Sequence, residues 1–130
     1  MTFTEIRDAV ISRITAQTAI PADSVTYPNG PTFNPAGRPV WARLTDVPGL
    51  AGVTEIGQGP VVHRTGIIII QIFVPAGSGT RLITETADQI RELFEFRSDG
   101  RLDYFAVSVV PAGEISGWAQ RNLHIPYRAL

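Results

Sequence analysis

The spacing of apolar residues predicts an amphipathic helix near the start of the chain. Four apolar residues recur at the three- to four-residue interval of one helical face: Phe3, Ile6, Val10 and Ile14. Thr2 and Glu5 stand at the two positions of a capping box, in which each side chain satisfies the other residue's backbone N–H. We therefore expect a helix from Phe3 to about Gln17.

A second amphipathic helix is predicted from Arg81 to Arg97, with Thr80 as its N-cap and Asp99-Gly100 closing it. Its apolar stripe is formed by Leu82, Ile83, Ala87, Ile90, Leu93, Phe94 and Phe96. Its charged residues fall on the opposite face: Glu85, Asp88, Arg91 and Glu92. This pattern is typical of a helix that packs one face on a sheet.

Two different patterns predict strands between the helices. The run Val40–Val47 alternates, with Val40, Ala42 and Leu44 on one face and Trp41, Arg43 and Thr45 on the other. We expect Pro48-Gly49 to end it, and short strands at Ser24–Tyr27 and Val53–Ile56. The run Ile67–Val74 is apolar almost throughout, which predicts a central strand covered on both faces.

Two more strands are predicted near the end of the chain, at Tyr104–Val110 and Gly117–Ile125. We expect Pro111 to stop the first and Pro126-Tyr127 to stop the second. The order of helix, strands, helix and strands predicts an α+β fold, a mostly antiparallel β-sheet with two main helices packed against it. The length favours a single domain over residues 1–130.

Composition removes several kinds of chemistry. The chain has no Cys, and its only histidines are His63 and His124, so it has neither a thiolate nor a three-histidine metal site. The formal net charge of −1 gives no support to general nucleic-acid binding. All eleven basic residues are arginine, which excludes lysine chemistry. We expect no enzyme activity, no catalytic residues, no cofactor and no metal.

The turn Gly77-Ser78-Gly79-Thr80 stands where a phosphate-binding loop would stand, between a strand and a helix. It lacks the lysine of a Walker loop and the third glycine of a dinucleotide fingerprint. A structural turn is therefore the favoured interpretation. A small ligand-binding domain or enzyme that uses the Gly77–Thr80 turn is the alternative.

No export or membrane signal is found in the sequence. Glu5 and Asp8 replace the basic start of a signal peptide. The longest apolar run, Ile67–Val74, is far shorter than the ~20 residues of a membrane-spanning helix. We expect a soluble protein without a membrane partner.

Aromatic and arginine residues suggest a surface that docks on another protein. The candidate interface residues are Phe33, Trp41, Arg43, Arg64 and Arg121. Phe33 lies in the proline-rich segment 28–38, which we expect to be a long ordered loop that it anchors. Whether Trp41 and Trp118 belong to the core or to an interface stays open at this point.

The chain resembles the bacteriophage tail terminator-like proteins, the tail completion proteins of long-tailed phages and gene-transfer particles. The segments that carry the resemblance are Tyr27–Phe33, Val40–Arg43, Arg64–Gly79, Ala87–Ile90 with Phe94, and Trp118–Tyr127. They extend over nearly the whole chain.

The resemblance implies a virion assembly protein that forms a hexameric ring on the head-proximal end of the tail after assembly in the host cytoplasm. Such a ring caps the tail tube, ends its polymerisation and provides the surface for head joining. Its implied partners are further copies of itself, the tail-tube protein and a head-connector or neck protein, with DNA passing through the lumen without specific binding. Another neck or tail component, such as a head–tail connector or tail-tube subunit, is the alternative.

Overall fold

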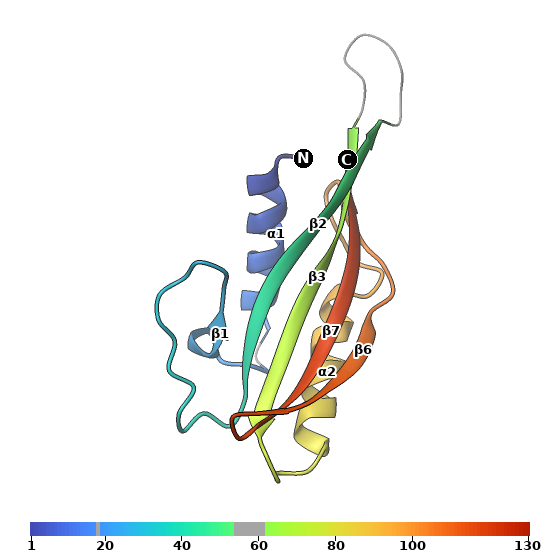
Figure 1. Cartoon of the computed structure of the whole chain (residues 1–130). Helices are drawn as coiled ribbons and strands as arrows, with labels where there is room; N and C mark the ends of the chain where they lie inside the picture. Colours follow the sequence, from blue (N-terminus) through green and yellow to red (C-terminus); the bar gives the residue numbers. More distant parts are fainter. Residues whose placement is uncertain (18, 54–61) are drawn as a thin grey trace.

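Two helices lie against one face of a curled, mostly antiparallel sheet in the computed structural model (Figure 1). The structure describes residues 1–17, 19–53 and 62–130. The helices are α1 (Phe3–Thr15) and α2 (Arg81–Phe94), and a 3-10 turn at Ala22–Ser24 follows α1. The strands are β1 (Val25–Thr26), β2 (Trp41–Val53), β3 (Val62–Pro75), β4 (Ser98–Asp99), β5 (Leu102–Tyr104), β6 (Ser108–Ile115) and β7 (Trp118–Ala129). This architecture confirms the α+β prediction.

The sheet is built around β3. The strand order is β1-β2-β3-β7-β5-β4, and β6 also pairs with β7. β3 pairs antiparallel with β2 from Phe73 to Val62 and with β7 from Pro75 to Arg64. Among the described strands, only β1 pairs in parallel, with Ala42 and Arg43 of β2. Sequential strands joined by short turns account for the antiparallel pairing.

The core lies between the helices and one face of the sheet. Every second residue of β3 enters it, and Ile68, Ile70 and Ile72 are almost fully buried. The prediction that β3 is covered on both faces is wrong: Ile67 is 38% exposed and Ile69 is half-buried. The reason is that both helices cover the same face of the sheet. An uninterrupted apolar run therefore does not mean burial on both sides here.

The capping box of α1 is confirmed. The Glu5 N–H donates to Oγ1 of Thr2 at 3.1 Å, and the Thr2 N–H donates to Oε1 of Glu5 at 3.2 Å. The helix ends at Thr15, two residues before the expected end. Phe3 was expected in the buried stripe but is 70% exposed. It lies in the first turn, where the guanidinium of Arg64 covers its ring, at 4.9 Å from the centroid.

β2 is longer than predicted because it passes through Pro48-Gly49. A register shift between Pro48 and Ala51 accommodates the proline, and β1 has already ended at this level of the sheet. Pro is tolerated in a strand at a bulge or at an edge. Of the expected short strand Val53–Ile56, only Val53 is described, and it is the last residue of β2. Residues 54–56 lie outside the described residues.

The other short strand is confirmed, but the predicted strand Tyr104–Val110 is wrong. β1 contains two of the four residues expected at Ser24–Tyr27. At the end of the chain, β5 stops at Tyr104, and β6 begins at Ser108 and passes through Pro111 with a register shift. The two strands pair with different parts of β7. Because β7 continues past Pro126 to Ala129, it has room for both.

α2 begins where predicted but ends at Phe94, before Arg97. Thr80 is the N-cap residue, although its side chain makes no capping hydrogen bond. Asp99-Gly100 does not close the helix and instead lies at the turn between β4 and β5. Leu82 and Phe96, expected in the apolar stripe, are exposed. The buried stripe of α2 is Ile83, Thr86, Ala87, Ile90 and Phe94.

A tyrosine crosses the sheet over a glycine to join two strands that do not pair with each other. The Tyr127 hydroxyl on β7 donates to Oδ1 of Asp46 on β2 at 2.9 Å. A Cβ on Gly66 of β3 would lie 2.5 Å from Oη of Tyr127. Partial burial raises the pKa of Asp46, and burial raises the pKa of Tyr127. The missing side chain of Gly66 is what makes room for this contact.

Replacing Gly66 by Ala should therefore destabilise the protein. We expect Gly66→Ala to lower the free energy of unfolding by about 1–3 kcal/mol, because the new methyl displaces the Tyr127 ring. Tyr127→Phe, which removes only the hydroxyl, should cost about 1 kcal/mol. Urea titration of both variants followed by circular dichroism measures the two effects. Unchanged stability of Gly66→Ala would show that the ring does not lie over this residue.

An arginine of α1 fixes the two helices and the small β4–β5 hairpin relative to one another. Nε and Nη2 of Arg13 donate to the two carboxylate oxygens of Asp99, at 2.9 and 2.7 Å. Nη1 of Arg13 donates to the Leu93 carbonyl at 2.6 Å. The Tyr104 hydroxyl also donates to Asp99, at 2.9 Å. The hydrogen bond from Arg13 holds the pKa of Asp99 below its usual value.

This pair predicts an acid-dependent loss of stability. Because the pKa of Asp99 is lower in the folded chain, its contribution is present at neutral pH and is lost as pH falls below about 4. We expect Asp99→Asn to cost about 1–2 kcal/mol at pH 7, since both side chains are mostly shielded from water. The difference from the wild type should shrink between about pH 5 and pH 2. Thermal unfolding across this range measures it, and a pH-independent difference would contradict the assignment.

Candidate functional site

The face of the sheet opposite the helices is the main candidate for a functional surface. Figure 1 shows α2 behind β7, with this open face toward the viewer. Strand register places the following residues on it: Thr45, Val47, Ile67, Ile69, Gln71, Asn122, His124, Pro126, Val110 and Ile115. Four of these are large apolar side chains that are clearly exposed: Val47, Ile67, Val110 and Ile115. We call this surface the open face.

An aromatic cluster lies at one end of the open face. Trp41 stacks on Phe73, its direct partner on β3, with centroids 4.0 Å apart and planes at 9°. Trp118 meets Trp41 edge-on at 5.8 Å, and Phe33 covers it at 5.2 Å. The Arg43 guanidinium lies 5.9 Å from the Trp41 ring and 5.8 Å from the Phe73 ring. These contacts attach the proline-rich loop to the sheet, which confirms Phe33 as the loop's anchor.

The structure brings together three of the five residues predicted to form an interface. Phe33, Trp41 and Arg43 meet at the aromatic cluster. Arg64 and Arg121 lie on the helix-covered face instead, because they alternate with residues of the open face along β3 and β7. The five therefore do not form one patch. Their role in subunit contacts stays a prediction.

Trp41 is buried by its own chain, so it packs within the aromatic cluster and offers little exposed area to a partner. It is 6% exposed, and its Nε1 has no hydrogen-bond partner among the described residues. Trp118 is half-buried. Trp41 therefore orders the loop and the Arg43 side chain, whereas Ile67 and Val47 provide exposed apolar contact area. Ile67 belongs to the apolar run of β3, and from the sequence alone such a run predicts a buried position and not an exposed one.

Local hydrogen bonds stabilise the Gly77–Thr80 turn. The Ser78 hydroxyl donates to the Pro75 carbonyl at 2.6 Å, and the Ser78 N–H donates to the same oxygen at 3.3 Å. Gly77 and Gly79 have φ values of 82° and 83°, which favour glycine. These contacts make a tight connection between β3 and α2. They support the structural interpretation of the turn.

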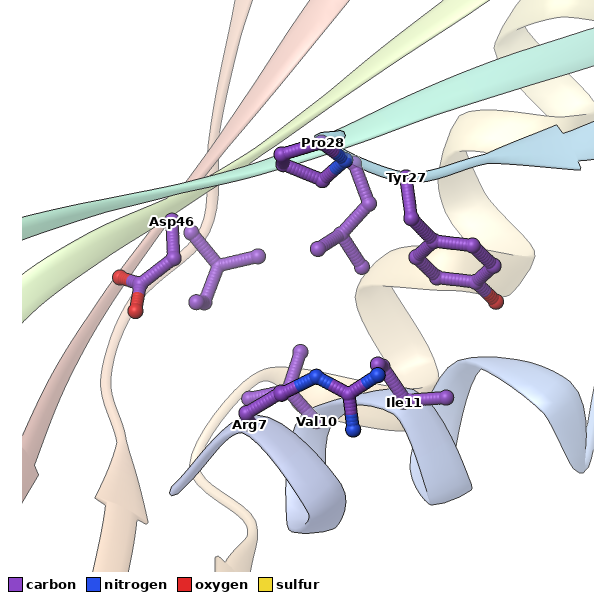
Figure 2. A pocket seen from close by; sticks show the side chains of 8 residues that line it. Arg7, Val10, Ile11, Tyr27, Pro28 and Asp46 are labelled. Atoms are coloured by element: carbon purple, nitrogen blue, oxygen red, sulfur yellow. The ribbon is translucent and has the colours of Figure 1, made fainter. Parts of the chain in front are cut away.

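The cavity shown in Figure 2 lies between α1 and strands β1 and β2. It has a volume of about 270 Å³ and apolar walls that include Val10, Ile11 and Leu44. Arg7 and Asp46 also line it. The Tyr27 hydroxyl is buried without a hydrogen-bond partner among the described residues, and burial raises the pKa of this group. The cavity is therefore suited to an apolar group of a ligand or partner that carries polar atoms beside that group.

The part of the chain that the structure describes contains no group of three or more His, Asp or Glu side chains placed to hold a metal ion. Neither helix there has the length and apolar character needed to cross a membrane.

The aromatic cluster predicts that Phe33 shields Trp41 from water. In a Trp118→Phe background, Phe33→Ala should shift Trp41 emission to longer wavelength and increase its quenching by acrylamide. We expect a loss of about 1 kcal/mol in stability, since an aromatic pair of this kind contributes that much. Phe33→Leu, which keeps an apolar cover, is the matched control. Unchanged emission and quenching in Phe33→Ala would contradict the packing of the loop.

Comparisons with known proteins identify the family. Nine chains among the solved structures match. One of them, whose name states no function, has a TM-score of 0.73 at 20% identity, and the match covers 100% of this chain and 96% of that chain. At this identity the likeness shows the fold. A search of the curated proteins gives no match. The model of the phage tail terminator protein family matches residues 5–110, which extend from α1 into β6. The chain therefore belongs to the phage tail terminator family.

Proposed function

We propose that this chain forms a hexameric ring that caps the finished tail tube, ends its polymerisation and presents a surface for head joining. The observation that carries the proposal is the family match over residues 5–110. Membership of this family gives the chain a role in the structure or assembly of the phage tail and contacts with other tail or head components. The ring, its six-fold symmetry and its position at the head-proximal end of the tail are the proposed part.

The open face supports an assembly role by its chemistry. Val47 and Ile67 are direct partners on β2 and β3, and they are 45% and 38% exposed. Covering apolar area of this kind contributes about 25 cal/mol per Å², so an assembled neighbour would stabilise it. Exposed apolar patches on small domains are often interaction sites. We therefore assign the open face to contacts with other subunits of the particle.

The alternatives differ in what loss of the protein does to the particle. A head–tail connector or another neck component would leave tails of normal length without heads. A tail-tube subunit would leave no tube. A ligand-binding domain or enzyme that uses the Gly77–Thr80 turn would leave tail length unchanged. The proposed terminator alone gives overlong, uncapped tails.

In the assembled ring that we propose, DNA passes through the lumen without specific binding.

Gene deletion with complementation tests the proposal and the open face together. Deleting the gene from its parent phage or particle should give overlong tails in electron micrographs, and the wild-type gene should restore normal length. Ile67→Glu should fail to restore it, because a carboxylate would have to be buried at the subunit contact. Its folding should be nearly unchanged, since Ile67 is already partly exposed.

The matched control is Leu82→Glu, because Leu82 is 39% exposed but lies on α2, away from the open face. We expect it to restore normal tails. Light scattering should show a hexamer for the wild type and Leu82→Glu, and a smaller species for Ile67→Glu. Normal tail length after deletion would exclude a terminator. Full complementation by Ile67→Glu would exclude the open face as an essential contact.

A further inference from the structure

α2 is followed by a tight turn with an exposed phenylalanine at its third position. Glu95 has φ −59° and ψ 119°, Phe96 has φ 55°, and the Arg97 N–H donates to the Phe94 carbonyl at 3.0 Å. This is the pattern of a type II turn, whose third position requires a positive φ and is usually glycine. A bulky residue in this conformation is strained. The Phe96 side chain is nevertheless 71% exposed, so burial within its own chain does not explain it.

The cavity between α1 and β2 has the size and lining to receive such a side chain. Its volume is about 270 Å³, whereas an apolar cavity of about 150 Å³ already holds a benzene molecule. Figure 2 shows Arg7 and Ile11 of α1 facing Pro28 across it, with Asp46 and Tyr27 at its two ends. Asp46 is partly exposed and accepts one hydrogen bond, from Tyr127. The cavity therefore combines apolar walls with one anion, Asp46, and with the side chain of Arg7, which pairs with Asp8 at 2.7 Å.

The phenylalanine and the cavity lie on different sides of α1: Arg7 and Ile11 line the cavity, whereas Arg13 contacts Leu93 and Asp99, which are each three residues from Phe96. The cavity is lined by Tyr27, directly after β1, and by residues of β2, which begin the strand order of the sheet. Phe96 precedes β4, the strand that ends this order, by two residues. A projecting group on one side and a matching hollow on the other produce a head-to-tail contact. Such contacts generate rings when the rotation between subunits closes.

We propose that Phe96 of one copy enters the α1–β2 cavity of the next copy in the ring. The inference rests on the proposed ring function and names one of its contacts. One pair of charges beside the two features is complementary: Arg97 follows Phe96, and Asp46 lines the cavity. Arg97 faces Asp46 in the contact, whereas Arg7 and Glu95 keep their pairs with Asp8 and Arg91. The strained turn holds the aromatic ring away from its own subunit, where it is available for this contact.

Replacing Phe96 by Gly separates this role from a structural one. Glycine suits the positive φ, so Phe96→Gly should keep or raise the unfolding temperature of the monomer. It should also weaken self-association at least tenfold in sedimentation velocity. Ser116→Gly is the matched backbone control, since Ser116 also has a positive φ, of 51°, and lies in the β6–β7 turn. It should leave association unchanged. Wild-type association by Phe96→Gly would overturn the proposal.

Cross-linking tests which surfaces meet, and the cysteine-free chain provides a clean background. Ile11 lines the cavity, so Phe96→Cys and Ile11→Cys are made as separate variants and then mixed under oxidising conditions. A disulfide-linked dimer should form in the mixture and in neither variant alone. Dimers of Phe96→Cys alone would mean a symmetric contact and would overturn the head-to-tail assignment.

The outcomes separate this contact from the proposed function. If the wild type forms rings and caps tails, but the mixture gives no disulfide and Phe96→Gly assembles normally, the contact is wrong and the function stands. If the wild type stays monomeric even with purified tail tubes, both the ring and the contact are wrong. If Phe96→Gly is less stable than the wild type as a monomer, the ring of Phe96 has a structural role within its own chain, contrary to the proposal.

Discussion

The structure depends on β3 being paired on both sides along most of its length while being covered on only one face. Ile68, Ile70 and Ile72 supply the core side of this strand, and both helices pack against it. The full pairing satisfies the backbone of β3, so the strand needs no second layer for its hydrogen bonds. Ile67 and Ile69 can then remain on the open face, which leaves the domain folded but with apolar surface to cover.

Two polar contacts fix the elements around this strand. Arg13 joins α1 to the end of α2 and to the β4–β5 hairpin through Asp99. Tyr127 joins β7 to β2 over Gly66. Each contact connects elements that are distant in sequence and whose main packing is apolar and non-directional. Such directional contacts select one arrangement among several that bury a similar apolar area. A subunit whose surfaces must fit several partners needs one fixed arrangement of its elements.

The functional interpretation rests on surfaces that the single chain leaves incomplete. Among the residues that the structure describes, the open face has apolar side chains without a covering layer, the Tyr27 hydroxyl beside α1 has no hydrogen-bond partner, and the turn after α2 holds Phe96 in a strained conformation. Each of these features costs stability in an isolated domain. Together they are consistent with a protein of the phage tail terminator family, whose final state is an assembly.

The sequence alone determined both helices, the α+β class and the long central strand, because period and capping residues are local properties. It also carried the family resemblance. It could not decide which face of β3 was covered, whether Pro48 and Pro111 ended strands, or that Arg64 and Arg121 lie away from Trp41. Those outcomes depend on where helices pack, on which edge of a strand is free and on how distant strands align. They are non-local, so only the tertiary structure decided them.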